Sequence, residues 1–178
     1  MIYTATPLED CWVIIPSLIQ DKRGSFMEAY QQHSFHKKIG PVHFIQDNEV
    51  HSHYGVIRGL HFQKDKSAQA KLVRVTQGSI VDIVVDLRPS SSTYRKSFRI
   101  ELSAENKKQL YVPKGFAHGY AVVSESATVL YKVDAPYSPE TEGGLSPRDP
   151  YFSFDWGIPE AQQQINERDL NWPKHVKT

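Results

Sequence analysis

The densest set of reactive side chains lies in residues 55–63, which read GVIRGLHFQ. Arg58 and His61 are three residues apart, so a regular strand would turn them to opposite faces. Gly59 lies between them and permits a bulge that would bring both side chains to one side. A cation beside a titratable imidazole suits an anionic substrate that undergoes proton transfer. The alternative is an exposed arginine and a hydrogen-bonded core histidine, and this segment alone leaves both open.

Further polar side chains recur on strand faces that could line a cavity. His118 follows the apolar alternation of residues 116–124, Tyr131 follows that of residues 128–134, and Lys71 shares a face with two valines. Burying a lysine without a partner is costly, so one interpretation is a small barrel whose mouth these groups line. In the other interpretation they extend to solvent at the rim, or the opposite face is the core.

Metal binding and other common chemistries have weaker support. His51 and His53 have the spacing that puts two imidazoles on one strand face, and His61 and His118 could add ligands. Lys71 would lower the affinity of such a site for a cation, and no acidic residue accompanies the last two histidines in a ligand pattern. We therefore predict no metal. No GxSxG, GxGxxG or GxxxxGK[ST] motif occurs, which argues against a serine hydrolase, a dinucleotide site and a P-loop.

Composition predicts one globular domain spanning residues 1–178. The net charge is +1, without a basic run, so nucleic acid is not an expected partner. Cys11 is the only cysteine, which excludes an internal disulfide and suggests a reducing, cytoplasmic location. The apolar stretches are too short to span a membrane, and the first ten residues do not resemble a signal peptide.

Period-two alternation in many short segments predicts an all-β fold of two packed sheets or a closed barrel. In residues 79–87 the alternation predicts that Val81, Ile83 and Val85 face inward and that Asp82 and Asp86 face outward. Two short helices are expected at residues 32–38 and 159–168, and a loop at 136–150. The expected strands are 11–15, 25–30, 44–53, 55–63, 71–76, 79–87, 97–102, 109–112, 116–124 and 128–134.

Between about residue 8 and Asp169, a series of motifs resembles the dTDP-4-dehydrorhamnose 3,5-epimerase family. The two most specific are GVIRGLHxQ at 55–63 and PxGFAHG at 113–119. The others are DxRGxFxE at 21–28, QDN at 46–48, QAKLVR at 69–74, YK at 131–132 and YxPE at 137–140. The resemblance implies a cupin-type jelly-roll β-barrel with a few short helices, a homodimer, and no metal or organic cofactor.

The resemblance also implies a reaction, in which C3 and C5 of dTDP-4-dehydro-6-deoxy-D-glucose are inverted to give dTDP-4-dehydro-L-rhamnose. The 4-keto group acidifies the neighbouring C–H bonds, so a base, an acid and a group that stabilises an oxyanion suffice. By resemblance His61 is the base, Asp169 orients it, Tyr131 is the acid on the other face and Lys71 stabilises the enolate oxygen.

Substrate-binding roles follow from the same resemblance. Arg23 and Arg58 would bind the diphosphate, whose oxygens match a guanidinium fork. Gln46 and Asn48 would add neutral hydrogen bonds nearby, and His118 would flank the sugar or its keto oxygen.

The nucleoside end of the substrate is assigned in the same way. Phe26 and Tyr137 would stack on the base, and Glu28 would accept a hydrogen bond from thymine N3–H. Glu142 would reach the sugar end of the ligand.

Several positions depart from the family pattern. Val50 replaces a serine, Tyr120 replaces the usual phenylalanine and adds a hydroxyl close to the sugar, and residues 147–149 and 166–169 are altered. The predicted acid, base and oxyanion group remain intact, which argues against a non-catalytic sugar-binding protein. The departures leave open a single-site epimerase, inverting only C3 or C5 of a related nucleotide-linked 4-keto-6-deoxy sugar.

Overall fold

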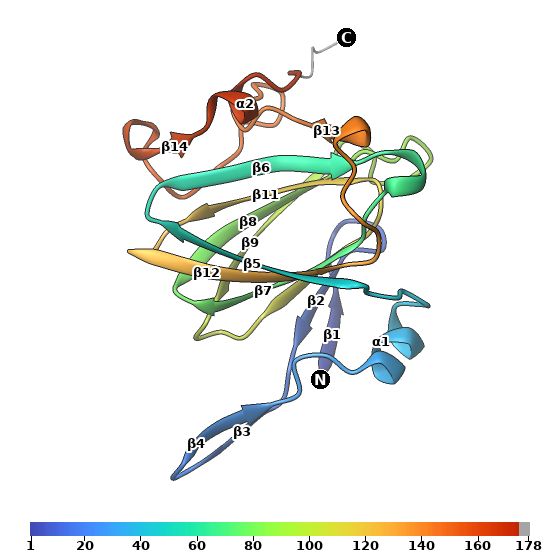
Figure 1. Cartoon of the computed structure of the whole chain (residues 1–178), viewed down its shortest axis with the longest axis vertical. Helices are drawn as coiled ribbons and strands as arrows, with labels where there is room; N and C mark the ends of the chain where they lie inside the picture. The colour runs from blue at the N-terminus through green and yellow to red at the C-terminus, as the bar shows by residue number, and fades with distance from the viewer. Residues whose placement is uncertain (175–178) are drawn as a thin grey trace.

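Two antiparallel sheets face one another in the computed structural model, which describes residues 1–174 (Figure 1). The first sheet has the order β1 (Ile2–Ala5), β2 (Trp12–Ile15), β10 (Gln109–Val112), β7 (Lys71–Gln77), β12 (Ser126–Val133) and β5 (Gln46–His53). The second has the order β13 (Glu142–Gly144), β6 (Val56–Gln63), β11 (Phe116–Val122), β8 (Ser79–Asp86) and β9 (Ser97–Ser103), and β14 (Gln164–Ile165) pairs in parallel with β6.

The all-β prediction is confirmed, and the strands form a sandwich. Apolar side chains from both sheets fill the space between them, including Val73 and Val129 from the first and Val84 and Phe116 from the second. Closure into a continuous barrel stays a prediction. Within residues 1–174 no helix is long and apolar enough to cross a membrane.

The first predicted helix is confirmed as α1 (Gln32–Lys38). The Gln31 side chain accepts a hydrogen bond of 2.6 Å from the Ser34 backbone N–H, which satisfies one free donor of the first turn. Phe35 is the buried residue of this helix and packs edge-on against Tyr111 of β10. The helix is therefore anchored to the outer face of the first sheet.

The prediction for β8 is wrong at its two aspartates. Asp82 and Asp86 are fully buried, because both faces of this strand are covered. Val81, Ile83 and Val85 pack with Trp156 in a second core outside the sandwich, so the opposite face, which carries Asp82, lies toward the first sheet. Alternation does not distinguish the two faces of a strand that is covered on both sides.

The predicted helix at 159–168 is also wrong. The segment forms the 3-10 turn η3 (Glu160–Gln162), then β14, and only then α2 (Glu167–Leu170). Pairing with the edge strand β6 uses backbone groups that a continuous helix would need. The expected loop at 136–150 likewise contains η2 (Pro139–Thr141) and β13, and a further 3-10 turn, η1 (Asp65–Ser67), follows β6.

A hairpin of β3 (Leu18–Asp21) and β4 (Gly24–Met27) projects from the body at the end opposite α2 (Figure 1). The expected strand at 25–30 is present only as this shorter β4. Ile19 and Phe26 pair across the hairpin and are 65% and 67% exposed. We call residues 18–27 the arm.

Candidate active site

A cavity of about 180 Å³ collects the predicted catalytic residues. A larger hollow of about 380 Å³ borders the first sheet near Tyr30 and Lys132, but of the predicted catalytic groups only Tyr131 reaches it. The smaller cavity is therefore the candidate site, because a base, a cation and an acid converge there. Its lining residues are Val50, Arg58, His61, Lys71, His118, Tyr120, Tyr131, Asn166 and Asp169.

An irregularity in β6 brings both Arg58 and His61 to this cavity, which agrees with one of the two interpretations of this segment. The pairing of β6 with β11 shifts register between His118 and Tyr120, opposite Gly59. Gly59 has φ +114°, and a Cβ there would lie 2.6 Å from the Cα of Gly119. Glycine is therefore required both by backbone conformation and by close approach of the neighbouring strand.

His61 and Asp169 form a hydrogen-bonded pair, with 2.7 Å between Nε2 and Oδ1. The other carboxylate oxygen accepts a hydrogen bond of 3.1 Å from the Gly59 backbone N–H. Burial acts to raise the pKa of Asp169, but the hydrogen bonds from His61 and Gly59 outweigh it and hold the pKa below its usual value. The ionised carboxylate fixes the imidazole and stabilises its protonated form. Asn166 caps α2 by accepting from the Asp169 backbone N–H, which sets the position of Asp169.

Lys71 and Tyr131 reach the cavity from the first sheet, whereas His61 comes from the second. Burial lowers the pKa of Lys71 to about 8, although the charges of Asp82 and Glu142 act in the other direction. Burial also raises the pKa of Tyr131, so its phenol keeps its proton at neutral pH. A base on one wall thus faces a proton donor and an ammonium group on the other.

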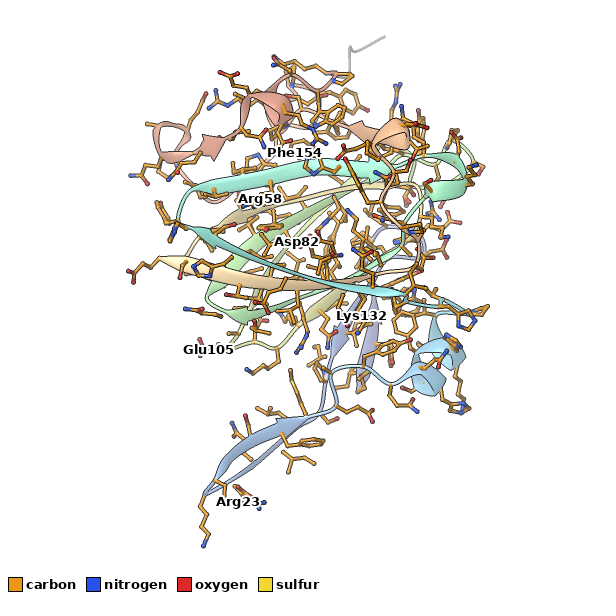
Figure 2. The ribbon with its side chains drawn as sticks, in the orientation of Figure 1. Arg23, Arg58, Asp82, Glu105, Lys132 and Phe154 are labelled. Atoms are coloured by element: carbon orange, nitrogen blue, oxygen red, sulfur yellow. The ribbon has the colours of Figure 1, made fainter. Side chains whose placement is uncertain are left out.

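A second imidazole–carboxylate pair lies in the same region, and of its two residues only His118 was predicted to lie at the site. His118 Nε2 is 3.0 Å from Asp82 Oδ2, and both side chains are buried (Figure 2 shows Asp82 between the sheets). The sequence predicts an outward Asp82 and so misses this contact. The signal was available in the inward alternation of residues 116–124, since a buried histidine needs a polar partner.

The predicted diphosphate ligand Arg58 borders the cavity, and its Nε donates to Ser52 Oγ at 3.0 Å. Gln46 and Asn48 lie on β5, the strand that also carries Ser52. The Gln46 side-chain amide donates a hydrogen bond of 2.7 Å to Asn48 Oδ1. Asn48 lies opposite Tyr131 in the register of β5 and β12. These two amides thus flank the cavity without lining it.

Tyr137 and Glu142 contact each other near the β13 edge of the second sheet. The Tyr137 hydroxyl donates to Glu142 Oε2 at 2.8 Å, and Glu142 is also ion-paired with Arg168 of α2. Tyr137 remains 52% exposed, so its ring is available to stack on a ligand. Gln63, whose role the sequence leaves open, holds this loop by accepting from the Ser138 N–H and the Thr141 hydroxyl.

The remaining predicted ligands lie away from the cavity. Arg23 is at the far end of the arm, whereas Arg58 and Asp82 lie within the body (Figure 2). Arg23 is exposed and pairs with Asp21 of its own hairpin at 2.7 Å. Phe26 is exposed on the same arm, and Glu28 follows β4 directly. A single chain therefore does not bring these three side chains to the site.

His51 and His53 lie on β5, two residues apart. Across residues 1–174 no group of three or more His, Cys, Asp or Glu side chains is arranged to hold a metal ion. The rings of His51 and His53 contact each other edge-on, with centroids 5.4 Å apart. His51 Nδ1 lies 3.0 Å from the Thr128 hydroxyl, so its ring is oriented by a neighbouring strand.

A cupin-like β-sandwich in which a carboxylate-oriented imidazole faces a phenol and an ammonium group defines a proton-transfer isomerase. The family model described as dTDP-4-dehydrorhamnose 3,5-epimerase matches residues 5–176. The chain belongs to this family.

Individual relatives agree in sequence and in structure. The dTDP-4-dehydrorhamnose 3,5-epimerase of Salmonella typhimurium is 43% identical over 157 residues, covering 88% of this chain and 86% of the relative. The crystal structure of the Elizabethkingia anophelis enzyme of that name has a TM-score of 0.95 and 49% identity, covering 98% and 96% of the two chains. A dTDP-6-deoxy-D-glucose-3,5-epimerase from Legionella pneumophila, solved in complex with dTDP-4-keto-L-rhamnose, has a TM-score of 0.89 and 36% identity, covering 99% of each chain.

Proposed function

We propose that this protein inverts C3 and C5 of dTDP-4-dehydro-6-deoxy-D-glucose and so forms dTDP-4-dehydro-L-rhamnose. The observation that carries the proposal is the placement of His61 and Tyr131 on opposite walls of one cavity, with Lys71 on the same wall as Tyr131. Inversion at carbon needs a proton to leave one face and another to arrive at the opposite face. Two groups on the same wall would return the proton to the face that it left.

The proposed reaction is balanced by proton transfers alone. His61 takes the proton from the carbon next to the 4-keto group, and the bonding electrons move to the keto oxygen as an enolate. The Lys71 ammonium stabilises that oxyanion, and Asp169 stabilises the imidazolium. Tyr131 then gives its proton to the opposite face of the carbon. Exchange with solvent restores the proton of Tyr131 and removes that of His61 before the second carbon reacts.

We further propose that the nucleotide end of the site is completed by a second copy of the chain. Phe26 and Arg23 lie on an arm that exposes apolar side chains and does not fold back onto its own body. An exposed apolar hairpin of this kind is typical of a segment that docks on a partner. In a homodimer with two-fold symmetry each arm would reach the partner's site, where Arg58 and Tyr137 would bind the same nucleotide.

A cytoplasmic location is proposed from the chemistry of Cys11. The thiol is fully buried, and burial raises its pKa to about 12, so it is an unreactive core group. The chain has no second cysteine for a disulfide, which suits a reducing compartment.

The direct test is to incubate the protein with dTDP-4-dehydro-6-deoxy-D-glucose in D₂O and follow C3 and C5 by NMR. We expect deuterium at both carbons and a product with the L-rhamno configuration. Deuterium and inversion at one carbon alone would instead identify a single-site epimerase. No exchange at either carbon, with protein that still binds dTDP, would refute the proposed reaction.

A further inference from the structure

Tyr120 presents a buried hydroxyl at the cavity. It is on β11, its side chain is 5% exposed, and it borders the same cavity as His61 and Tyr131. Among residues 1–174 its Oη has no hydrogen-bond partner. The ring lies beside that of His118, with centroids 6.5 Å apart.

Packing alone does not explain this residue. Phenylalanine would fill nearly the same space without a polar atom. A buried hydroxyl without a partner destabilises the folded chain, and native proteins pair almost all such groups. The hydroxyl of Tyr120 therefore calls for a partner that the chain itself does not supply.

The surroundings indicate what kind of partner fits. Burial raises the pKa of Tyr120 to about 12, opposed by the charge of Arg58 and by a weak polar contact with Ser52, so the phenol keeps its proton and can donate at neutral pH. Arg58 can only donate, and the Ser52 hydroxyl, which accepts from Arg58, does not meet hydrogen-bond geometry with Tyr120 Oη. The missing partner is therefore a hydrogen-bond acceptor that enters the cavity.

We propose that Tyr120 is a specificity-determining residue whose hydroxyl donates to an oxygen of the bound hexose. The inference rests on the proposed function, because it takes the occupant of the cavity to be a sugar nucleotide. The hexose is favoured over the diphosphate because Arg58, the expected diphosphate ligand, is exposed, whereas Tyr120 is buried beside His118. A site that donates to a substrate oxygen discriminates against analogues lacking that oxygen.

The test compares binding of two ligands to the Tyr120→Phe protein by calorimetry. dTDP-D-glucose has no keto group and does not epimerise, so it reports ground-state binding of nucleotide plus sugar, and dTDP reports the nucleotide alone. We expect about three- to tenfold weaker binding of dTDP-D-glucose and unchanged binding of dTDP. With the 2-deoxy and 3-deoxy sugar analogues, the effect of the substitution should vanish for the one that lacks the contacted oxygen.

Tyr111→Phe is the matched control, since Tyr111 is a similarly buried phenol outside this cavity. It should leave both affinities unchanged. Without ligand, Tyr120→Phe should melt at the wild-type temperature or above, because it removes an unpaired hydroxyl. A lower melting temperature would reveal a partner within the protein and overturn the proposal.

Two binding results would also overturn it. Equal affinities of wild type and Tyr120→Phe for dTDP-D-glucose would exclude the contact, and equal weakening for dTDP would move it to the diphosphate. Failure of the proposed function is a separate result: the wild type would exchange no deuterium at C3 or C5, while sugar binding could still depend on Tyr120.

Discussion

The cavity and the arm differ in how completely one chain assembles them. In the cavity, His61 is already held by Asp169 at 2.7 Å, and Lys71 and Tyr131 lie on the facing wall. On the arm, Phe26 is 67% exposed, and it does not line that cavity. Proton transfer requires fixed geometry within fractions of an ångström, so its groups are built on strands of one sandwich. The nucleotide recognition that we propose for the arm would tolerate assembly from two chains.

The largest predicted effect is a loss of kcat when the base in the cavity is removed and the arm is left intact. His61→Ala should lower kcat by about 10²- to 10⁴-fold, because it removes the general base, while the Kd for dTDP stays within twofold of wild type. Steady-state kinetics and calorimetry measure the two quantities. His53→Ala, an exposed histidine on β5, is the control and should change neither. A comparable loss of dTDP affinity in His61→Ala would contradict the assigned role.

Substitutions on the arm are expected to have a smaller effect, and to change KM rather than kcat. Arg23→Ala and Phe26→Ala should each raise KM by about tenfold or more, with kcat within a few-fold of wild type, if the arm binds only the nucleotide end. Lys22→Ala removes a neighbouring cation at the same hairpin turn and serves as the control. A kcat loss with unchanged KM would show that the arm takes part in the chemistry.

The pH dependence of Lys71 sharpens the description of the cavity. With a pKa of about 8 in the folded protein, Lys71 loses its charge above that pH, and kcat/KM should fall about fourfold by pH 8.5. The free energy of unfolding should instead rise with pH over this range. The unfolded chain keeps this proton up to about pH 10.5, so it binds more protons than the folded chain between pH 8 and 10.5. The cost of burying the charged ammonium is therefore relieved, and stability rises, as pH increases through this range.

Lys71→Arg provides the check on that assignment, because a guanidinium does not titrate in this range. The kcat/KM that this variant retains should not decrease above pH 8. The same fall in Lys71→Arg would assign the titration to another group.

Local signals in the sequence predict much of the fold and the centre of the site. Alternation locates most strands to within two residues, and the glycine between Arg58 and His61 predicts the irregularity that aims both side chains inward. Family motifs then identify Asp169, which is distant in sequence and hydrogen-bonded to His61 in the structure.

The failures share a physical cause, which is burial that depends on distant segments. Asp82 is assigned to the wrong face because Trp156, far along the chain, covers the other side of β8. The helix expected at 159–168 is replaced by turns and by a strand that pairs with β6. The sequence does not predict that the arm projects from the body, because the same apolar residues could pack against their own chain or against a second chain.

A mixed dimer tests most directly whether one chain holds the base while its partner supplies the nucleotide clamp. His61→Ala and Arg23→Ala/Phe26→Ala chains, carrying different affinity tags, are co-expressed and the heterodimer is purified. One of its two sites would combine an intact His61 with an intact arm from the other chain, so we predict about half of wild-type kcat/KM. Activity no higher than that of the two parent homodimers would contradict the account, because it would mean that each arm serves its own chain.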